Sequence, residues 1–148
     1  MQKQQLIQAC RDYLKDKINS LNTIINEVKE SSNSESKSSA GDKHETSKAM
    51  MQLEIEKLGT QLKEAELKLL EFDKINFNMN FQCIEQGSLV ETNRGYFLIA
   101  VSIGKITVDD KMVFVISNKS PLAVVFADKQ QKDSLSFNGM EYTIMAIY

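Results

Sequence analysis

The stretch MQLEIEKLGTQLKEAELKLLEF, residues 51–72, decides the fold of this chain. Its apolar side chains recur at alternating spacings of three and four residues, which places them on one stripe of a helix. The members of this stripe are Met51, Ile55, Leu58, Leu62, Ala65, Leu69 and Phe72. Charged residues such as Glu54 and Lys57 lie off the stripe. The stretch therefore predicts an amphipathic helix with one packing seam.

A second stripe with the same spacing precedes the first. Its members are Ile7, Cys10, Leu14, Ile18, Leu21, Ile25 and Val28. Residues 31–47 lie between the two stripes and are rich in Ser, Asn, Lys and Glu, with almost no apolar side chain to bury. Two such helices bury their stripes most simply by folding back on each other. We therefore predict that residues 1–75 form an antiparallel α-helical coiled-coil hairpin with a polar tip at 31–47.

The periodicity changes to that of β-strands after Phe72. Apolar residues alternate with Asn from Ile75 to Phe81, which predicts a strand. Further runs of strand type are 88–92, 95–101, 112–116 and 140–148. The pair Asn138-Gly139 predicts a hairpin turn before the last run.

A short helix is expected in this second half, from Pro121 to Ala127. Pro is well placed in a first helical turn, and Ser120 can cap the helix N-terminus. Residues 76–148 are therefore predicted to form a small β-rich domain. The fold class of the whole chain is α+β.

Composition excludes several classes of protein. Residues 1–75 carry 12 basic and 13 acidic side chains, and residues 76–148 carry 6 and 7, so neither half offers the clustered positive charge that binds nucleic-acid phosphates. We expect no sequence-specific DNA binding. The sequence has neither a membrane-spanning stretch nor a signal-peptide core, and we expect a cytoplasmic protein without membrane association.

The polar tip holds the residues best suited to special chemistry. Asp42 and Glu45 are three positions apart, and in a helix they would share a face and hold one divalent cation through hard oxygen ligands. Two carboxylates alone bind Mg²⁺ weakly, so this pair would be half of a site that a partner completes. The same spacing also resembles a capping box, in which Asp42 and Glu45 only satisfy backbone N–H groups. Both interpretations stay open at this point.

The parts of an independent catalytic site are missing from the sequence. Cys10 and Cys83 fall in different segments and are expected to be buried free thiols. A nucleophilic cysteine would need a histidine base, and the only histidine, His44, lies in the polar connection. The sequence contains no Gly-rich phosphate loop and no metal-ligand spacing of Cys or His. We predict that the protein is not an enzyme.

Several short motifs resemble those of the bacterial Gre transcript-cleavage factors, a family of transcription elongation factors. Gly41-Asp42-Lys43-His44-Glu45 is similar to the family's tip motif and falls between two helical segments. Gly87-Ser88-Leu89-Val90 resembles a strand motif of the family's small domain, and the segment 116–122, with Ser120-Pro121-Leu122, resembles another. The order of these motifs extends the resemblance over nearly the whole chain.

The resemblance implies a function. In this family the coiled coil enters the secondary channel of bacterial RNA polymerase, and the tip acids help to hold a Mg²⁺ ion shared with the polymerase active site. The polymerase then cleaves the 3′ end of backtracked RNA. Carried over, Asp42 would be the principal metal-positioning carboxylate and Glu45 its companion. The small domain would have an FK506-binding-protein-like (FKBP-like) fold and dock on the channel rim, with no cofactor of its own.

Alternatives from other classes remain. One alternative is a regulator that occupies the channel and inhibits or tunes the polymerase without cleavage. Another is a non-catalytic coiled-coil adaptor. A prolyl isomerase would need an aromatic pocket in the small domain, whereas a small sheet uses its aromatic residues mainly as core. The aromatic candidates are Tyr96, Phe97, Phe114, Phe126 and Tyr142.

Overall fold

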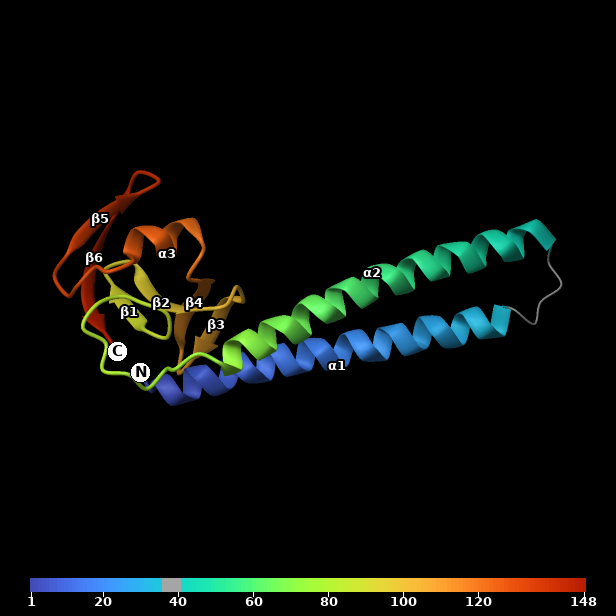
Figure 1. The fold of residues 1–148 in the computed structure, drawn as a ribbon, viewed down its shortest axis with the longest axis horizontal. Coiled ribbons are helices and arrows are strands. Elements are labelled where there is room, and N and C mark those ends of the chain that lie inside the picture. Colours follow the sequence, from blue (N-terminus) through green and yellow to red (C-terminus); the bar gives the residue numbers. More distant parts are fainter. Residues whose placement is uncertain (36–40) are drawn as a thin grey trace. The chain divides into compact units, whose positions relative to one another are not determined.

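The computed structural model describes residues 1–35 and 41–148, without the side chains of 34–35 and 41–44. The predicted α+β class is confirmed: two long N-terminal helices pack against each other and a mixed sheet follows (Figure 1). The helices are α1 (Lys3–Glu35) and α2 (Gly41–Asp73), of 33 residues each. Both helices extend into the segment 31–47 that we expected to be a polar connection, and residues 36–40 of that segment lie outside the described residues.

The chain divides into two compact units. One unit is Tyr13–Leu69, which contains most of both helices, and the other joins Met1–Asp12 to Leu70–Tyr148. The first turns of α1 and the last turn of α2 therefore belong with the sheet. No helix in the described part of the chain is both long enough and apolar enough to span a membrane.

The unit Tyr13–Leu69 is held together by the two predicted apolar stripes. Its buried core consists of Leu21, Ile25, Leu58 and Ala65, with Ile18, Val28 and Leu62 packed against it. Every one of these residues belongs to a stripe identified from the spacing of apolar residues. The helix-to-helix packing thus follows directly from the three-four periodicity.

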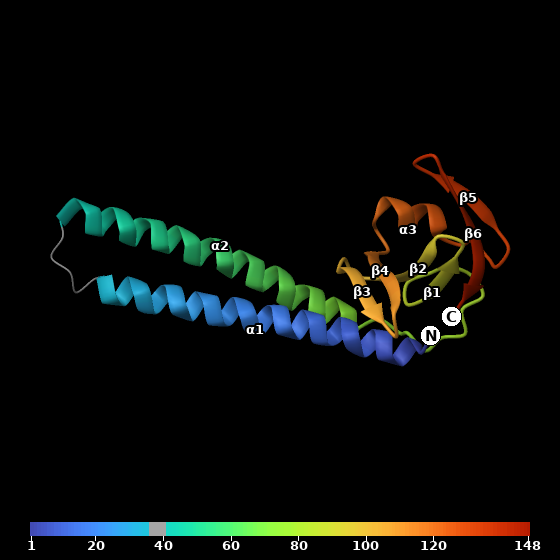
Figure 2. The same cartoon turned by 180° about the vertical axis from the view of Figure 1, so that it is seen from behind.

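The second unit contains a six-stranded mixed sheet. The strands are β1 (Leu89–Thr92), β2 (Gly95–Ala100), β3 (Gly104–Val108), β4 (Lys111–Ser117), β5 (Ser134–Phe137) and β6 (Met140–Ile147). Their order across the sheet is β3-β4-β2-β1-β6-β5, and only β2 and β4 pair in parallel. Four of these strands match predicted runs, whereas β3 and β5 were not predicted. Figure 2 shows the same elements from behind.

The strand predicted from Ile75 to Phe81 is wrong, because this segment forms no ladder with any strand. Phe77 and Phe81 are buried as the alternation implied, but the backbone is irregular. The Asn76 side-chain oxygen accepts a hydrogen bond of 3.0 Å from the Asn78 backbone N–H. Asn side chains that bond nearby backbone in this way compete with sheet formation. The segment is therefore a loop anchored by its aromatic side chains.

One face of the sheet carries an aromatic core under the short helix α3 (Pro121–Phe126). The Phe97 ring lies 5.5 Å from Phe114, 5.3 Å from Phe126 and 6.0 Å from Tyr142, measured between ring centroids. The predicted helix and its cap are confirmed, since the Ser120 hydroxyl accepts a hydrogen bond from the Ala123 N–H at 3.4 Å. This cap fixes α3 over the aromatic rings.

Two hairpins have two-residue turns with positive φ at both positions. The turn predicted at Asn138-Gly139 is confirmed, with φ of 52° and 76°. Asp109 and Asp110, with φ of 51° and 61°, make the equivalent turn between β3 and β4. Such turns match the right-handed twist of the strands that they connect.

The beginning of α1 is tied to the sheet unit by side-chain bonds. The Lys3 ammonium donates to the carbonyl oxygens of Phe77 at 2.7 Å and Tyr148 at 2.9 Å. It also lies 4.5 Å from the centroid of the Phe81 ring. Arg11 forms an ion pair of 3.0 Å with Asp73, which joins the first part of α1 to the last residue of α2. These contacts explain why residues 1–12 belong to this unit.

Candidate functional site

The predicted site residues Asp42 and Glu45 lie in the first turns of α2. Because α2 begins at Gly41, positions 42 and 45 are separated by three residues of helix and share one face of it. Glu45 is exposed to solvent. The side chains of Asp42 and His44 are outside the described residues, so the structure gives no distance between the two carboxylates.

The start of α2 also bears on the capping alternative. A capping box places its first residue just before the helix, where the side chain accepts a backbone hydrogen bond. The described part of α2 starts at Gly41, directly after residues 36–40, so it does not distinguish a cap at Asp42 from a place in the first turn, and both interpretations stay open. A carboxylate in the first turn interacts favourably with the positive end of the helix dipole and with the free N–H groups there.

A resident metal site is absent from the described part of the chain. No three or more His, Cys, Asp or Glu side chains among the described residues come close enough to hold an ion. Of the predicted pair, the exposed Glu45 has no such group around it.

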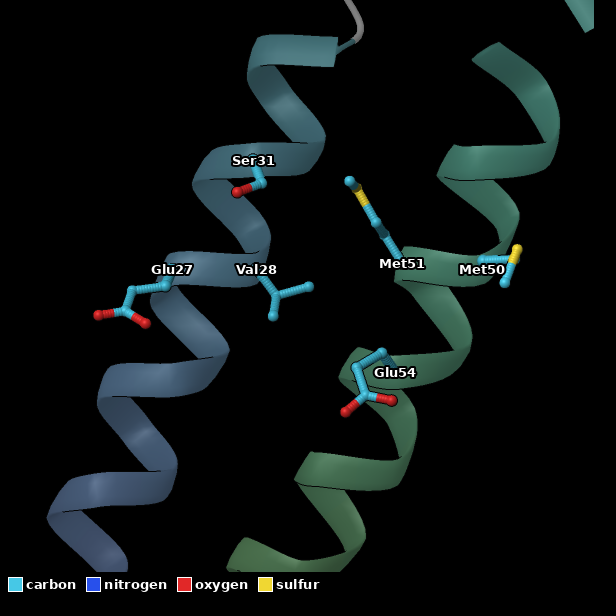
Figure 3. A pocket seen from close by; sticks show the side chains of 6 residues that line it. All are labelled: Glu27, Val28, Ser31, Met50, Met51 and Glu54. Atoms are coloured by element: carbon cyan, nitrogen blue, oxygen red, sulfur yellow. The ribbon is translucent and has the colours of Figure 1, made fainter. Parts of the chain in front are cut away.

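An open hollow of about 530 Å³ lies between the helices near their connection. Val28 and Met51 point into the space between α1 and α2, whereas Glu27 points away from α2 and Met50 away from α1 (Figure 3). Val28 and Met51 are only half-buried, although Leu21 and Leu58 further along the same seam are buried. The seam thus loosens towards the end of the hairpin that carries Asp42 and Glu45.

The two cysteines are free thiols, as predicted. Cys10 is fully buried, and burial raises the pKa of its thiol to about 12. Cys83 is half-buried, and its pKa is raised by burial first and then by the charges of Glu85 and Asp128. A raised pKa keeps a thiol protonated and poorly nucleophilic at neutral pH. Neither cysteine has the surroundings of a catalytic nucleophile.

The aromatic candidates of the small domain divide into core and surface. Phe126 is fully buried, and Phe97 and Tyr142 are buried beside it. Phe97, Phe114 and Tyr142 also line a hollow of about 430 Å³, together with residues that the sequence did not single out: Arg94, Ile116, Leu122 and Met140. Tyr96 is separate from this hollow, and its hydroxyl donates to Glu91 at 3.4 Å. Arg94 was missed because it stands in a polar turn, and only the pairing of distant strands brings it to the hollow.

The short motifs fall at defined places in the fold. Leu89 and Val90 of the first small-domain motif begin β1, and Ser120-Pro121-Leu122 of the second opens α3. A scan against models of known protein families finds no match, and no curated protein matches the chain in sequence. The resemblance to Gre factors therefore stays a prediction that rests on these motifs and on their order.

Proposed function

We propose that this chain is an accessory factor of bacterial RNA polymerase, which inserts its helical hairpin in the secondary channel and stimulates cleavage of backtracked RNA. One observation carries the proposal: Asp42 and Glu45 share a helix face in the first turns of α2, at the connection end of a hairpin of two 33-residue helices. A long, narrow pair of helices is suited to carrying two carboxylates into a confined channel.

The chemistry of the two carboxylates supports a shared ion. Asp and Glu oxygens are ligands that Mg²⁺ accepts, but the ion normally keeps several waters and takes further ligands from its partner or substrate. At the polymerase, Mg²⁺ would supply Lewis-acid activation of the attacking water. The role of this chain would be to place Asp42 and Glu45 on one face of α2, which follows from their spacing in the helix.

The sheet unit would serve as the docking part of the factor. In this proposal it is an FKBP-like domain that binds the rim of the channel and has no isomerase activity of its own. The factor would act in the bacterial cytoplasm, where the polymerase is. The near-neutral charge of residues 76–148 favours a protein surface over nucleic acid as its partner.

The test is cleavage of labelled RNA in a stalled, backtracked elongation complex of the cognate polymerase. The wild-type chain is compared with Asp42→Asn/Glu45→Gln and with Glu64→Gln/Glu66→Gln, a control that removes two exposed carboxylates from the middle of the same helix. We expect the wild type and the control to accelerate Mg²⁺-dependent shortening, and the Asp42/Glu45 variant to give the unassisted rate.

Three other outcomes would overturn this proposal. Binding to the polymerase without acceleration would make the chain a channel-occupying regulator that inhibits or tunes transcription. Absence of binding would return it to the class of coiled-coil adaptors. Equal loss of activity in both double variants would show that charge along the hairpin, and not the tip pair, is what matters.

A further inference from the structure

The hollow beside the aromatic core has the composition of a small-ligand site. Six of its seven lining residues are apolar or aromatic: Phe97, Phe114, Ile116, Leu122, Met140 and Tyr142. The seventh, Arg94, supplies a positive charge. Its volume of about 430 Å³ lies within the usual range for small-molecule pockets, roughly 300 to 1,000 Å³, and such pockets are mostly apolar with a few polar groups that fix orientation.

Tyr142 provides a polar group that the protein itself does not use. Its side chain is 6% exposed, and its hydroxyl makes no hydrogen bond with any described residue. In the described part of the chain, every fully buried side-chain oxygen or nitrogen has a hydrogen-bond partner. The Tyr142 hydroxyl has none, so it is not fully buried and is accessible to solvent. Tyr142 is also one of the residues that line the hollow.

The Arg94 guanidinium lies over the Tyr142 ring, and only one of its nitrogens makes a hydrogen bond with a described residue. Its Nε donates to the backbone carbonyl oxygen of Glu141 at 2.8 Å, and its Cζ lies 5.7 Å from the centroid of the Tyr142 ring. The two terminal nitrogens have no hydrogen-bond partner or ion pair among the described residues. These nitrogens form the part of the guanidinium that binds a carboxylate through two parallel hydrogen bonds.

A second cation, Lys105, lies beside Phe114, another aromatic residue that lines the hollow. Lys105 pairs with Phe114 across β3 and β4, and its ammonium lies 5.7 Å from the Phe114 ring centroid. No carboxylate is among the residues that line the hollow. Arg94, the charged residue that lines the hollow, therefore complements a negative ligand.

We propose that this hollow binds a small carboxylic acid with an aromatic or branched apolar body. The body packs between Phe97, Phe114 and Leu122, and the carboxylate accepts hydrogen bonds from the Tyr142 hydroxyl and the terminal nitrogens of Arg94. This inference does not depend on the proposed function, because it concerns neither the hairpin nor the tip.

The test uses 3-phenylpropionate as the probe and 3-phenylpropionamide as its neutral match. Each is titrated to millimolar concentration into the ¹⁵N-labelled full chain, and the backbone amide resonances of Arg94, Phe114 and Tyr142 are followed by NMR. We expect saturable shifts at these positions and tighter binding of the acid, by about tenfold, because hydrogen bonds to a charged group are stronger than those to a neutral one.

The variants separate the carboxylate contact from the apolar pocket. Arg94→Gln is expected to abolish the preference for the acid over the amide, and Tyr142→Phe to weaken both ligands while the ring core stays intact. Lys111→Gln is the matched control, since Lys111 also lies over an aromatic ring, that of Tyr96, which is outside the hollow. It should leave both affinities unchanged, and a well-dispersed spectrum verifies the fold of each variant.

Three results would overturn the proposal. They are the absence of saturable shifts in a folded wild-type chain, equal affinity for acid and amide, and an acid preference that survives Arg94→Gln. Binding of a short peptide that ends in phenylalanine, without binding of the free acid, would also reject it and would assign the hollow to a protein partner.

Discussion

The Lys3 side-chain ammonium donates a hydrogen bond of 2.7 Å to the carbonyl oxygen of Phe77, 74 residues further along the chain. A second bond of 2.9 Å reaches the carbonyl oxygen of Tyr148. Lys3→Met keeps the length of the side chain but removes both donors. We expect this variant to lose about 1–3 kcal/mol of unfolding free energy, because carbonyl groups lose their partners. Urea unfolding measures the loss, and an unchanged midpoint would mean that water replaces the ammonium.

The pH dependence of the Lys3 contribution has a definite sign. Burial lowers the pKa of Lys3 from 10.5 to about 8 in the folded chain. Between these two values the unfolded state binds more protons than the folded state, so the stability contributed by this group rises with pH. The neutral amine retains two N–H donors for its two carbonyl partners. We therefore expect the stability of the wild type relative to Lys3→Met to increase from about pH 8 to pH 10.5.

The comparison with Lys3→Met removes the effect of other groups that titrate at high pH, such as Cys10 and Tyr148, since both proteins contain them. A difference that stays constant over this range would contradict a lowered pKa for Lys3.

A side chain at position 87 would meet two obstacles, a positive φ and a close backbone oxygen. Gly104 shares only the first of these, so a comparison of the two glycines separates the two effects. The φ of Gly87 is +98°, and a Cβ at this position would stand 2.4 Å from the carbonyl oxygen of Asn76. Gly104 has a similar φ of +102°, but nothing lies within 4 Å of its Cβ position. We expect Gly104→Ala to cost about 1–3 kcal/mol from backbone strain alone. Gly87→Ala should cost clearly more, as measured by thermal unfolding, and equal costs would show that the Asn76 loop simply moves aside.

The hairpin seam is tested by two identical substitutions in α2. Leu58 is 6% exposed in the core of the hairpin, whereas Leu53 is 65% exposed. Leu58→Ala is expected to destabilise the protein by about 2–5 kcal/mol, and Leu53→Ala by no more than about 0.5 kcal/mol. Helical circular dichroism during denaturation gives both values. A large effect of Leu53→Ala would indicate that another chain covers this exposed side chain.

The two thiols are predicted to differ in their access to alkylating reagents. Cys10 is fully buried with a pKa of about 12, so iodoacetamide should modify it only when the protein unfolds. Cys83 is half-buried and should react first, though slowly, because its pKa is also raised. Mass spectrometry of the wild type and of Cys83→Ser follows each thiol separately. Rapid modification of Cys10 in the native protein would contradict its burial.

The helical half of the fold was predictable because its signal is long and regular. Leu21, Ile25, Leu58 and Ala65 are core residues that spacing alone identifies, since a helix must present residues three and four apart on the same side. The ends were harder to predict. Ser31 and Glu45 are helical although the surrounding composition is polar, because a helix can continue into solvent without burying its last turns.

The sheet was only partly predictable, because strand signals are short and depend on partners. In β3 only Ile106 is buried, and its neighbours Lys105 and Thr107 are exposed at a sheet edge. The opposite error occurred at Phe77, where an alternating pattern is satisfied by a loop whose backbone partner is the Lys3 side chain. No local pattern contains that information, because the two residues are brought together by the tertiary fold.

The candidate site was predicted as positions and not as geometry. Helical spacing places positions 42 and 45 on one face of α2, but it does not give the distance between the two carboxylates. The apolar hollow could not be predicted even as a set of positions. Arg94 and Tyr142 are 48 positions apart, and only the sheet brings the guanidinium over the ring.

The place of β1 in the sheet has a consequence for how the protein is made. β1 pairs on one side with β2, which follows it directly, and on the other side with β6, where Val90 faces Ile147. A ribosome delivers β6 only after some fifty further residues, so the newly synthesised chain holds β1 with one edge bare during that interval. A nascent chain stopped before Met140 would leave the backbone N–H and C=O groups of that edge open to strands of other molecules. We therefore expect truncated products of interrupted translation to aggregate more readily than the full chain.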